Sequence, residues 1–128
     1  DIDTAVVSLQ FASGAIGTID NSRQAVYGYD QRIEAFGSDG SASNTNLYPD
    51  AVTISNGTRV ERASLPLNFF LERYMVSYQN ELVAFVDALE NGSSVPVSGY
   101  DGRVPVVMAM AAKKSLVENR PVKLSEIG

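Results

Sequence analysis

The sequence predicts an α+β domain, in which helices pack on one face of a mostly antiparallel sheet and leave the other face open. Alternating apolar patterns typical of strands fill the first half of the chain. Two long segments with helical spacing follow, and then one short strand pattern. Strands that precede helices in this order favour an antiparallel sheet. A chain of 128 residues, 45% of them hydrophobic, fits one folded domain.

The first element is expected to be a β-hairpin with a well-defined register. A three-residue loop over 12–14, with Gly14 in the left-handed conformation, sets Phe11 opposite Ala15. In this register one face of the hairpin is wholly apolar. That face consists of Ala5, Val7, Leu9, Phe11, Ala15, Gly17 and Ile19. A slip of one residue would destroy this sorting, so the pattern specifies the register.

A second hairpin is expected over residues 51–63, after a strand at 31–36, a turn signal at 37–40 and a polar loop at 44–50. Two turns compete for this hairpin. A two-residue turn at the Asn-Gly pair sets an isoleucine opposite an arginine. A three-residue loop instead sets Val52 opposite Val60, and we favour it because it keeps the apolar residues together.

A long helix is expected over residues 70–90. Its apolar side chains recur at helical spacing and form one stripe. The stripe consists of Phe70, Tyr74, Tyr78, Leu82, Phe85, Val86 and Leu89. The Asn-Gly pair at 91–92 predicts the end of this helix.

A second helix should run to about Asn119, and either Ser98 or Asp101 could cap its start. With Asp101 as the cap, Pro105 lies in the first turn, where its missing N–H costs little. With Ser98 as the cap, Pro105 lies deeper and a helical hydrogen bond is lost. We therefore expect Asp101 to be the cap. Residues 121–124 have the pattern of a short final strand.

Composition excludes several classes of function. The net charge is −5 and the ten Lys and Arg residues are scattered, so nucleic acid is not an expected partner. No apolar run approaches the roughly 20 residues that span a bilayer, so no membrane partner is expected. Cysteine, histidine and phosphate-binding glycine motifs are absent from the sequence. It therefore predicts no catalytic, cofactor-binding or metal-binding residue in this chain. The start without Met is interpreted as a fragment boundary.

The run Tyr27-Gly28-Tyr29-Asp30 is the most unusual cluster of side chains in the sequence. In one interpretation the two rings cover an end of the core and the glycine permits a bulge. In the other, the two phenol hydroxyls bind a polyol, because tyrosine combines an apolar face with a donor–acceptor tip. Spacing of two residues would place both rings on one side of an extended segment. Both interpretations stay open on the residues alone.

Several segments together resemble one protein family. They are residues 11–19, 27–40, 70–74, 101–103 and 121–124. In their order and spacing they resemble the C-terminal domain of the glucose–fructose oxidoreductase and inositol dehydrogenase family. Within that family the Tyr-Gly-Tyr-Asp run is most similar to inositol 2-dehydrogenases. The resemblance covers nearly the whole chain.

The resemblance implies that residues 1–128 are a C-terminal substrate-binding and oligomerisation domain, and that an N-terminal Rossmann domain is absent from this chain. It implies an enzyme that oxidises a cyclic polyol such as myo-inositol to its ketone. NAD would be bound by the full-length protein and not by this chain alone, so the isolated chain is expected to be inactive. Carried over by position, the substrate contacts are Tyr29 first, Tyr27 next and Arg73 as the weakest candidate.

The resemblance also implies partners and a location. The partners are the polyol, the protein's own Rossmann domain and further copies in a dimer or tetramer joined through the sheet. The second face of the first hairpin carries Val6, Ile16 and Thr18 and is mixed enough to be buried against another copy. The expected location is the cytoplasm. Two alternatives stay open: a non-enzymatic dimerisation or binding module, and a sibling dehydrogenase acting on an aldose or another cyclitol.

Overall fold

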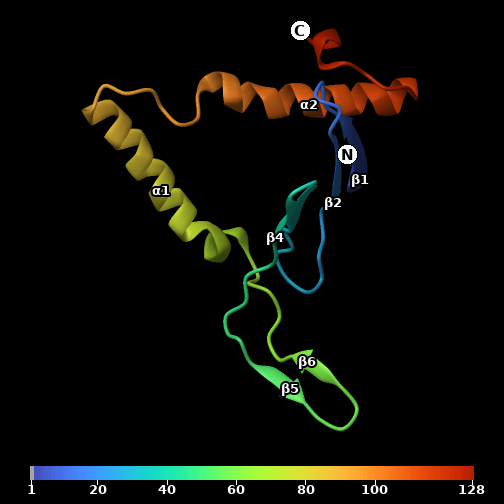
Figure 1. Cartoon of the computed structure of the whole chain (residues 1–128), viewed down its shortest axis with the longest axis vertical. Helices are drawn as coiled ribbons and strands as arrows, with labels where there is room; N and C mark the ends of the chain where they lie inside the picture. Colours follow the sequence, from blue (N-terminus) through green and yellow to red (C-terminus); the bar gives the residue numbers. More distant parts are fainter. Residues whose placement is uncertain (1) are drawn as a thin grey trace. The chain divides into compact units, whose positions relative to one another are not determined.

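The computed structural model describes residues 2–128 and confirms the α+β class (Figure 1). The chain divides into two compact units, one comprising residues 2–5 and 21–79 and the other residues 6–20 and 80–128. The strands and helices are β1 (Thr4–Gln10), β2 (Ile16–Ser22), β3 (Ile33–Gly37), β4 (Gly40–Asn44), β5 (Thr53–Ser55), β6 (Val60–Arg62), α1 (Phe70–Glu90), α2 (Gly99–Glu118) and the 3-10 helix η1 (Leu124–Glu126). The described strands form three separate two-stranded sheets, each a hairpin, whereas the sequence predicted a single sheet.

The β1–β2 hairpin has the predicted turn. The Phe11 N–H donates to the Ala15 carbonyl at 2.9 Å, and Gly14 adopts a left-handed φ of 90°. Alternate residues of β1 are half-buried, starting at Ala5, as the predicted apolar face requires. A Cβ built on Gly17 would lie 3.4 Å from the Phe11 ring, which places Gly17 on that same face. The register predicted for this hairpin is therefore confirmed at its turn.

The β3–β4 hairpin differs from the sequence prediction at both strands. β3 begins at Ile33 instead of residue 31, because the Gln31 N–H donates to the Asn46 side chain at 2.8 Å and not to a neighbouring strand. β4 was not predicted at all. Its sequence, Gly-Ser-Ala-Ser-Asn, has no apolar alternation, yet it pairs in register from Gly37↔Gly40 to Ile33↔Asn44.

The β5–β6 hairpin is present, but both registers considered for it are wrong. Ser55 pairs with Val60, so the loop contains four residues, 56–59. The Asn56 side-chain oxygen accepts hydrogen bonds from the Thr58 N–H at 2.9 Å and from the Arg59 N–H at 3.2 Å. This side chain therefore organises the longer turn, and its local hydrogen bonds outweigh the matching of apolar residues across the strands.

Helix α1 has the predicted bounds. It ends where Gly92 takes a φ of 61° and the Ser93 N–H donates to the Ala88 carbonyl at 3.0 Å, a hydrogen-bond pattern typical of helix ends. The apolar stripe expected on this helix is largely exposed: Leu82 is 66% and Leu89 65% accessible. No helix of the described chain combines the length and the apolar character needed to cross a bilayer.

Helix α2 begins earlier than the sequence predicted. Ser98 is the N-cap, because the Ser98 N–H donates to the Asp101 carboxylate at 2.8 Å and the Asp101 N–H donates back to the Ser98 hydroxyl at 3.4 Å. This reciprocal capping box satisfies two N–H groups at once, which outweighs the cost of placing Pro105 inside the helix. The predicted end is confirmed, with Asn119 as a left-handed C-cap at φ 51°.

The short strand predicted at 121–124 is wrong, because that segment leads into η1 instead. The Glu126 carboxylate accepts from the Lys123 N–H at 2.9 Å and from the Arg120 guanidinium at 2.7 Å. These bonds close the chain into a tight turn before any strand can form. Arg120 holds the pKa of Glu126 well below its ordinary value, at about 2.

Few apolar side chains are buried in either unit. Among the described residues the buried hydrophobic ones are Ala88, Val107 and Ala111, all in the unit that contains α2. Large side chains on the outer face of the first hairpin are open, with Val6 71% and Ile16 84% accessible. A monomeric domain usually covers its large apolar groups more fully than this.

Candidate functional site

The two tyrosines of the sequence cluster lie on a turn and not on an extended strand. The Gly28 N–H donates to the Ala25 carbonyl at 3.2 Å, and Gly28 has a φ of 135°. The spacing argument that placed both rings on one side of an extended segment therefore does not apply. A Cβ on Gly28 would lie only 2.8 Å from the Pro66 carbonyl oxygen, so this close backbone approach requires glycine.

Tyr29 is fixed at both its backbone and its ring. Its N–H donates to the Leu67 carbonyl at 2.8 Å. Its half-buried ring meets the Tyr74 ring edge-on, with centroids 5.9 Å apart and planes at 88°. This geometry is favourable for aromatic pairs, and it joins the turn to the first part of α1.

Tyr27 makes a different contact. Its hydroxyl donates a short hydrogen bond to the Asp30 carboxylate. The hydrogen bond to Asp30 raises the pKa of Tyr27, because the neighbouring anion holds the phenol proton in place. Tyr27 is nevertheless 42% exposed, so part of it faces solvent.

Asp30 is the centre of a polar network. Arg32 donates to it twice, from Nε at 2.8 Å and from Nη2 at 2.9 Å, and Asn46 donates from Nδ2 at 2.8 Å. The Asp30 side chain is 15% accessible. The hydrogen bonds from Arg32, and then those from Tyr27 and Asn46, lower the pKa of Asp30 to about 2. Such a carboxylate is a poor general base near neutral pH.

Arg73 lies in the first part of α1, close to the same turn. Its Nη2 donates to the Gln31 carbonyl at 3.2 Å, and its guanidinium carbon lies 5.5 Å from the centre of the Tyr74 ring. Its Nε and Nη1 atoms are buried, and they have no hydrogen-bond acceptor among the described residues. Arg73 therefore has two donor nitrogens for which the described chain supplies no partner.

The three residues predicted to bind substrate thus lie in one unit, but they do not all contact the same neighbour. Tyr29 and Arg73 both approach the Tyr74 ring, whereas Tyr27 is paired with Asp30. The sequence analysis did not assign roles to Asp30 or Tyr74, although both lay in segments that it quoted. For Asn46 the sequence offers no signal, since nothing in a polar loop indicates which side chain turns inward.

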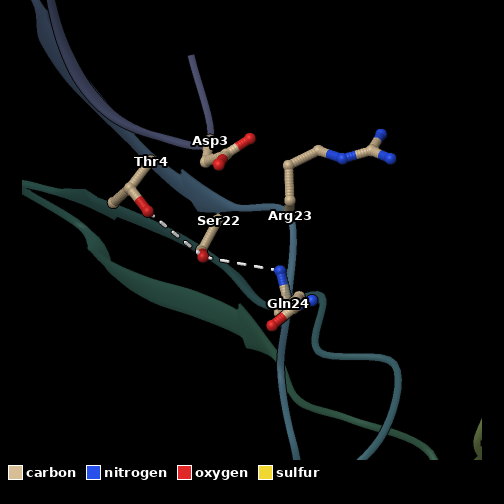
Figure 2. A pocket seen from close by; sticks show the side chains of 5 residues that line it. All are labelled: Asp3, Thr4, Ser22, Arg23 and Gln24. Atoms are coloured by element: carbon tan, nitrogen blue, oxygen red, sulfur yellow. Dashed lines mark hydrogen bonds between the residues drawn. The ribbon is translucent and has the colours of Figure 1, made fainter. Parts of the chain in front are cut away.

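A surface pocket lies elsewhere in the same unit, where β1 starts and β2 ends. Figure 2 shows its five lining residues, Asp3, Thr4, Ser22, Arg23 and Gln24, all of them exposed. The Thr4 hydroxyl donates to the Ser22 hydroxyl at 3.3 Å, and the Gln24 N–H donates to the same oxygen at 3.5 Å. None of these residues is a predicted site residue. The two hydrogen bonds between them are long, so they stabilise the shape of the pocket only weakly.

Comparison with known proteins defines the class first. Residues 1–124 match a family model described as "Oxidoreductase family, C-terminal alpha/beta domain". The chain belongs to this family of oxidoreductase domains. The resemblance to the glucose–fructose oxidoreductase and inositol dehydrogenase family that the sequence predicted is therefore confirmed.

Particular relatives refine the comparison. The chain is 51% identical over 127 residues to the myo-inositol 2-dehydrogenase of Thermotoga maritima, covering 99% of this chain and 38% of the relative. It is 41% identical to the inositol 2-dehydrogenase of Rhizobium meliloti, over 98% of this chain and 38% of that protein. A crystal structure of a probable dehydrogenase from Thermotoga maritima superimposes with a TM-score of 0.94 at 51% identity, over 100% of this chain and 38% of that one. The chain spans well under half the length of these relatives.

Proposed function

We propose that this chain is the C-terminal substrate-binding and oligomerisation domain of an NAD-dependent inositol 2-dehydrogenase, which oxidises a cyclic polyol such as myo-inositol to its ketone. The observation that carries this proposal is the 51% identity, over nearly the whole chain, to a protein named myo-inositol 2-dehydrogenase. A more distant Bacillus subtilis relative, 32% identical, is named scyllo-inositol 2-dehydrogenase (NAD(+)), which supports NAD as the hydride acceptor.

The residues described here do not fit an NAD site. None of the described glycines with positive φ lies at the start of α1 or α2, where a dinucleotide phosphate would need a glycine turn. NAD would therefore be bound by the rest of the full-length protein, in an N-terminal Rossmann domain. NAD supplies the chemistry of hydride transfer. The isolated chain is then expected to be inactive.

The proposed work of this chain is to bind and orient the polyol. Tyr29 is the first candidate for contact, because Leu67 fixes its backbone and Tyr74 packs against its ring. A phenol can both donate to and accept from a hydroxyl of the polyol. Tyr27 and Arg73 would add further hydrogen bonds. The Nε and Nη1 atoms of Arg73, which have no acceptor among the described residues, support a role in binding an oxygen acceptor.

The second part of the proposal concerns assembly through the sheet into a dimer or tetramer. The exposed side chains on the outer face of the first hairpin, with Val6 71% and Ile16 84% accessible, support burial against another copy. Location in the cytoplasm stays a prediction.

The test uses the full-length gene product that contains this chain. Purified protein should reduce NAD in the presence of myo-inositol, and Tyr29→Phe should lower kcat/KM by about 10-fold, because one hydrogen bond to the substrate is lost. Tyr100→Phe is the matched control, since Tyr100 is 71% exposed and lies in the other unit.

Three outcomes would contradict the proposal. A native product with a mass near 13.7 kDa and no dinucleotide-binding domain would favour a non-enzymatic module. Turnover of an aldose without turnover of inositols would favour a sibling dehydrogenase. Turnover by the isolated chain would show that catalytic groups were overlooked.

A further inference from the structure

We propose that Asp30 is a positioning residue that makes Tyr27 a dedicated hydrogen-bond acceptor for one hydroxyl group of the substrate. The inference rests on the proposed function, because a polyol supplies the hydroxyl that would donate. It assigns Tyr27 a narrower task than a general contact, and it assigns Asp30 a part in substrate selection without contact to the substrate.

The Asp30 carboxylate has no acceptor position left for a ligand. One carboxylate oxygen accepts from Arg32 Nε and Asn46 Nδ2, both at 2.8 Å. The other accepts from Arg32 Nη2 at 2.9 Å and from the Tyr27 hydroxyl. A carboxylate offers about four acceptor positions, so all of them are filled. Asp30 therefore acts on a ligand only through its neighbours.

The second step concerns the single proton of the Tyr27 hydroxyl. That proton is given to Asp30, so Tyr27 has none left to donate to a ligand. The phenol oxygen still has acceptor capacity, and no described residue is recorded as donating to it. With 42% of Tyr27 accessible, a ligand can approach the side chain. Tyr27 can therefore accept a hydrogen bond but not offer one.

The third step is that the anion strengthens this acceptor. A hydroxyl that donates to a charged acceptor becomes a better acceptor itself, because hydrogen bonds in a chain polarise one another. The raised pKa of Tyr27 agrees with a proton held firmly by Asp30. The hydrogen bond to Asp30 is the largest cause of the raised pKa; burial and Tyr48 also raise the pKa, and Arg32 lowers it.

The two tyrosines then select different features of a polyol. Tyr27 requires a group that donates, which a hydroxyl does and a fluorine, an ether or a ketone does not. The contact that fixes the Tyr29 ring leaves its hydroxyl without an acceptor among the described residues, so that hydroxyl can donate to any of those groups. One ring position of the substrate should therefore have to carry a free hydroxyl.

The kinetic test compares deoxy and deoxyfluoro analogues of myo-inositol at each ring position, using the full-length protein. A fluorine accepts weakly but cannot donate. At the position contacted by Tyr27, both analogues should lose about 10-fold in kcat/KM, mostly through KM. Tyr27→Phe should abolish this loss at that position only. Retained discrimination in Tyr27→Phe would overturn the proposal.

The second test does not depend on activity. Tyrosine labelled with 13C at Cζ reports the ionisation of each phenol by NMR, and the Tyr27 signal is the one missing from Tyr27→Phe. In Asp30→Asn the pKa of Tyr27 should fall towards its ordinary value of about 10. Asn46→Ala is the matched control, because it removes a neighbour of Asp30 and keeps the carboxylate beside Tyr27. An unchanged Tyr27 pKa in Asp30→Asn would overturn the positioning role.

The two tests separate the possible failures. If the full-length protein oxidises no polyol, the proposed function fails and the hydroxyl ligand fails with it, whereas the NMR comparison still decides whether Asp30 holds the Tyr27 proton. If Asp30→Asn does not fold, Tyr27→Phe still decides the kinetic part, since it removes one hydroxyl and keeps the ring.

Discussion

Asp30 and Arg73 lie in the same unit and carry opposite charges, yet they differ in how their hydrogen-bonding capacity is used. All acceptor positions of Asp30 are filled by Tyr27, Arg32 and Asn46. Arg73 has one recorded acceptor, the Gln31 carbonyl, and its Nε and Nη1 have none among the described residues. Unpaired buried donors cost free energy. The contrast indicates that the hydrogen bonds of Asp30 are complete within the described chain, whereas those of Arg73 are not. Donors left without a partner are expected of a residue that binds a ligand.

The largest effect is expected from Gly28→Ala, which acts on the turn between Tyr27 and Tyr29. The new Cβ would lie 2.8 Å from the Pro66 carbonyl oxygen at a φ of 135°. We expect the free energy of unfolding of the full-length protein to fall by about 3 kcal/mol or more, measured by urea denaturation. Gly57→Ala is the control, since its Cβ would meet nothing within 4 Å. Equal effects of the two substitutions would show that the close contact is absent in solution.

The next largest effect on stability should come from Asn46→Ala, which removes one of the residues that hydrogen-bond to Asp30. Asn46 donates to Asp30 and accepts from the Gln31 N–H, both at 2.8 Å. Loss of both bonds should lower the free energy of unfolding by about 2 kcal/mol. The exposed neighbour Thr45 provides the control, and Thr45→Ala should change stability by less than about 0.5 kcal/mol. A loss no larger than that of the control would mean that the network does not stabilise the fold.

Acid should weaken the hydrogen-bond network around Asp30. The folded-state pKa of Asp30 is about 2, below its ordinary 3.8. Its contribution is therefore fully present above about pH 4 and is lost as the pH falls towards 2, because the unfolded chain binds the proton first. Urea denaturation of wild type and Asp30→Asn across this range should show a steeper loss for the wild type. Parallel curves would rule out the depressed pKa.

The smallest effect on stability is expected from Arg73→Met. It removes one hydrogen bond together with two unpaired buried donors, so the gains and losses nearly cancel, to within about 1 kcal/mol. Activity should respond more strongly than stability, with KM for the polyol rising several-fold in the full-length enzyme. The control is Arg59→Met at an exposed salt bridge with Glu61. A large loss of stability with unchanged KM would make Arg73 structural.

How far the sequence predicts the fold depends on which interaction decides each element. Apolar periodicity predicted the β1–β2 turn and the extent of α1, and the Asn-Gly pair at 91–92 predicted where α1 ends. It failed where one polar side chain decides, at the Asn56 turn and at the Glu126 turn before η1. These local hydrogen bonds depend on the orientation of a single side chain, which the pattern of apolar and polar residues does not predict.

The candidate site shows the same division. The sequence drew attention to Tyr27 and Tyr29, and the family resemblance added Arg73. Neither the sequence nor the resemblance showed that the chain turns at Gly28, between the two tyrosines. Because of this turn, Tyr27 and Tyr29 contact different partners. Asn46 could not have been found, because its contact with Asp30 joins residues 16 apart through a loop without regular structure.

The capping box of α2 makes the position of a helix end depend on acidity. Ser98 holds the start of the helix only while the Asp101 carboxylate accepts its N–H and hydroxyl, and the bonds with Ser98 lower the pKa of Asp101. Pro105 cannot donate to the Asp101 carbonyl, so backbone bonding in that first stretch is already one short. Once Asp101 is protonated the first turn should unwind, and the shorter helix would start with Pro105 in its first turn, the start that the missing N–H of Pro105 favours.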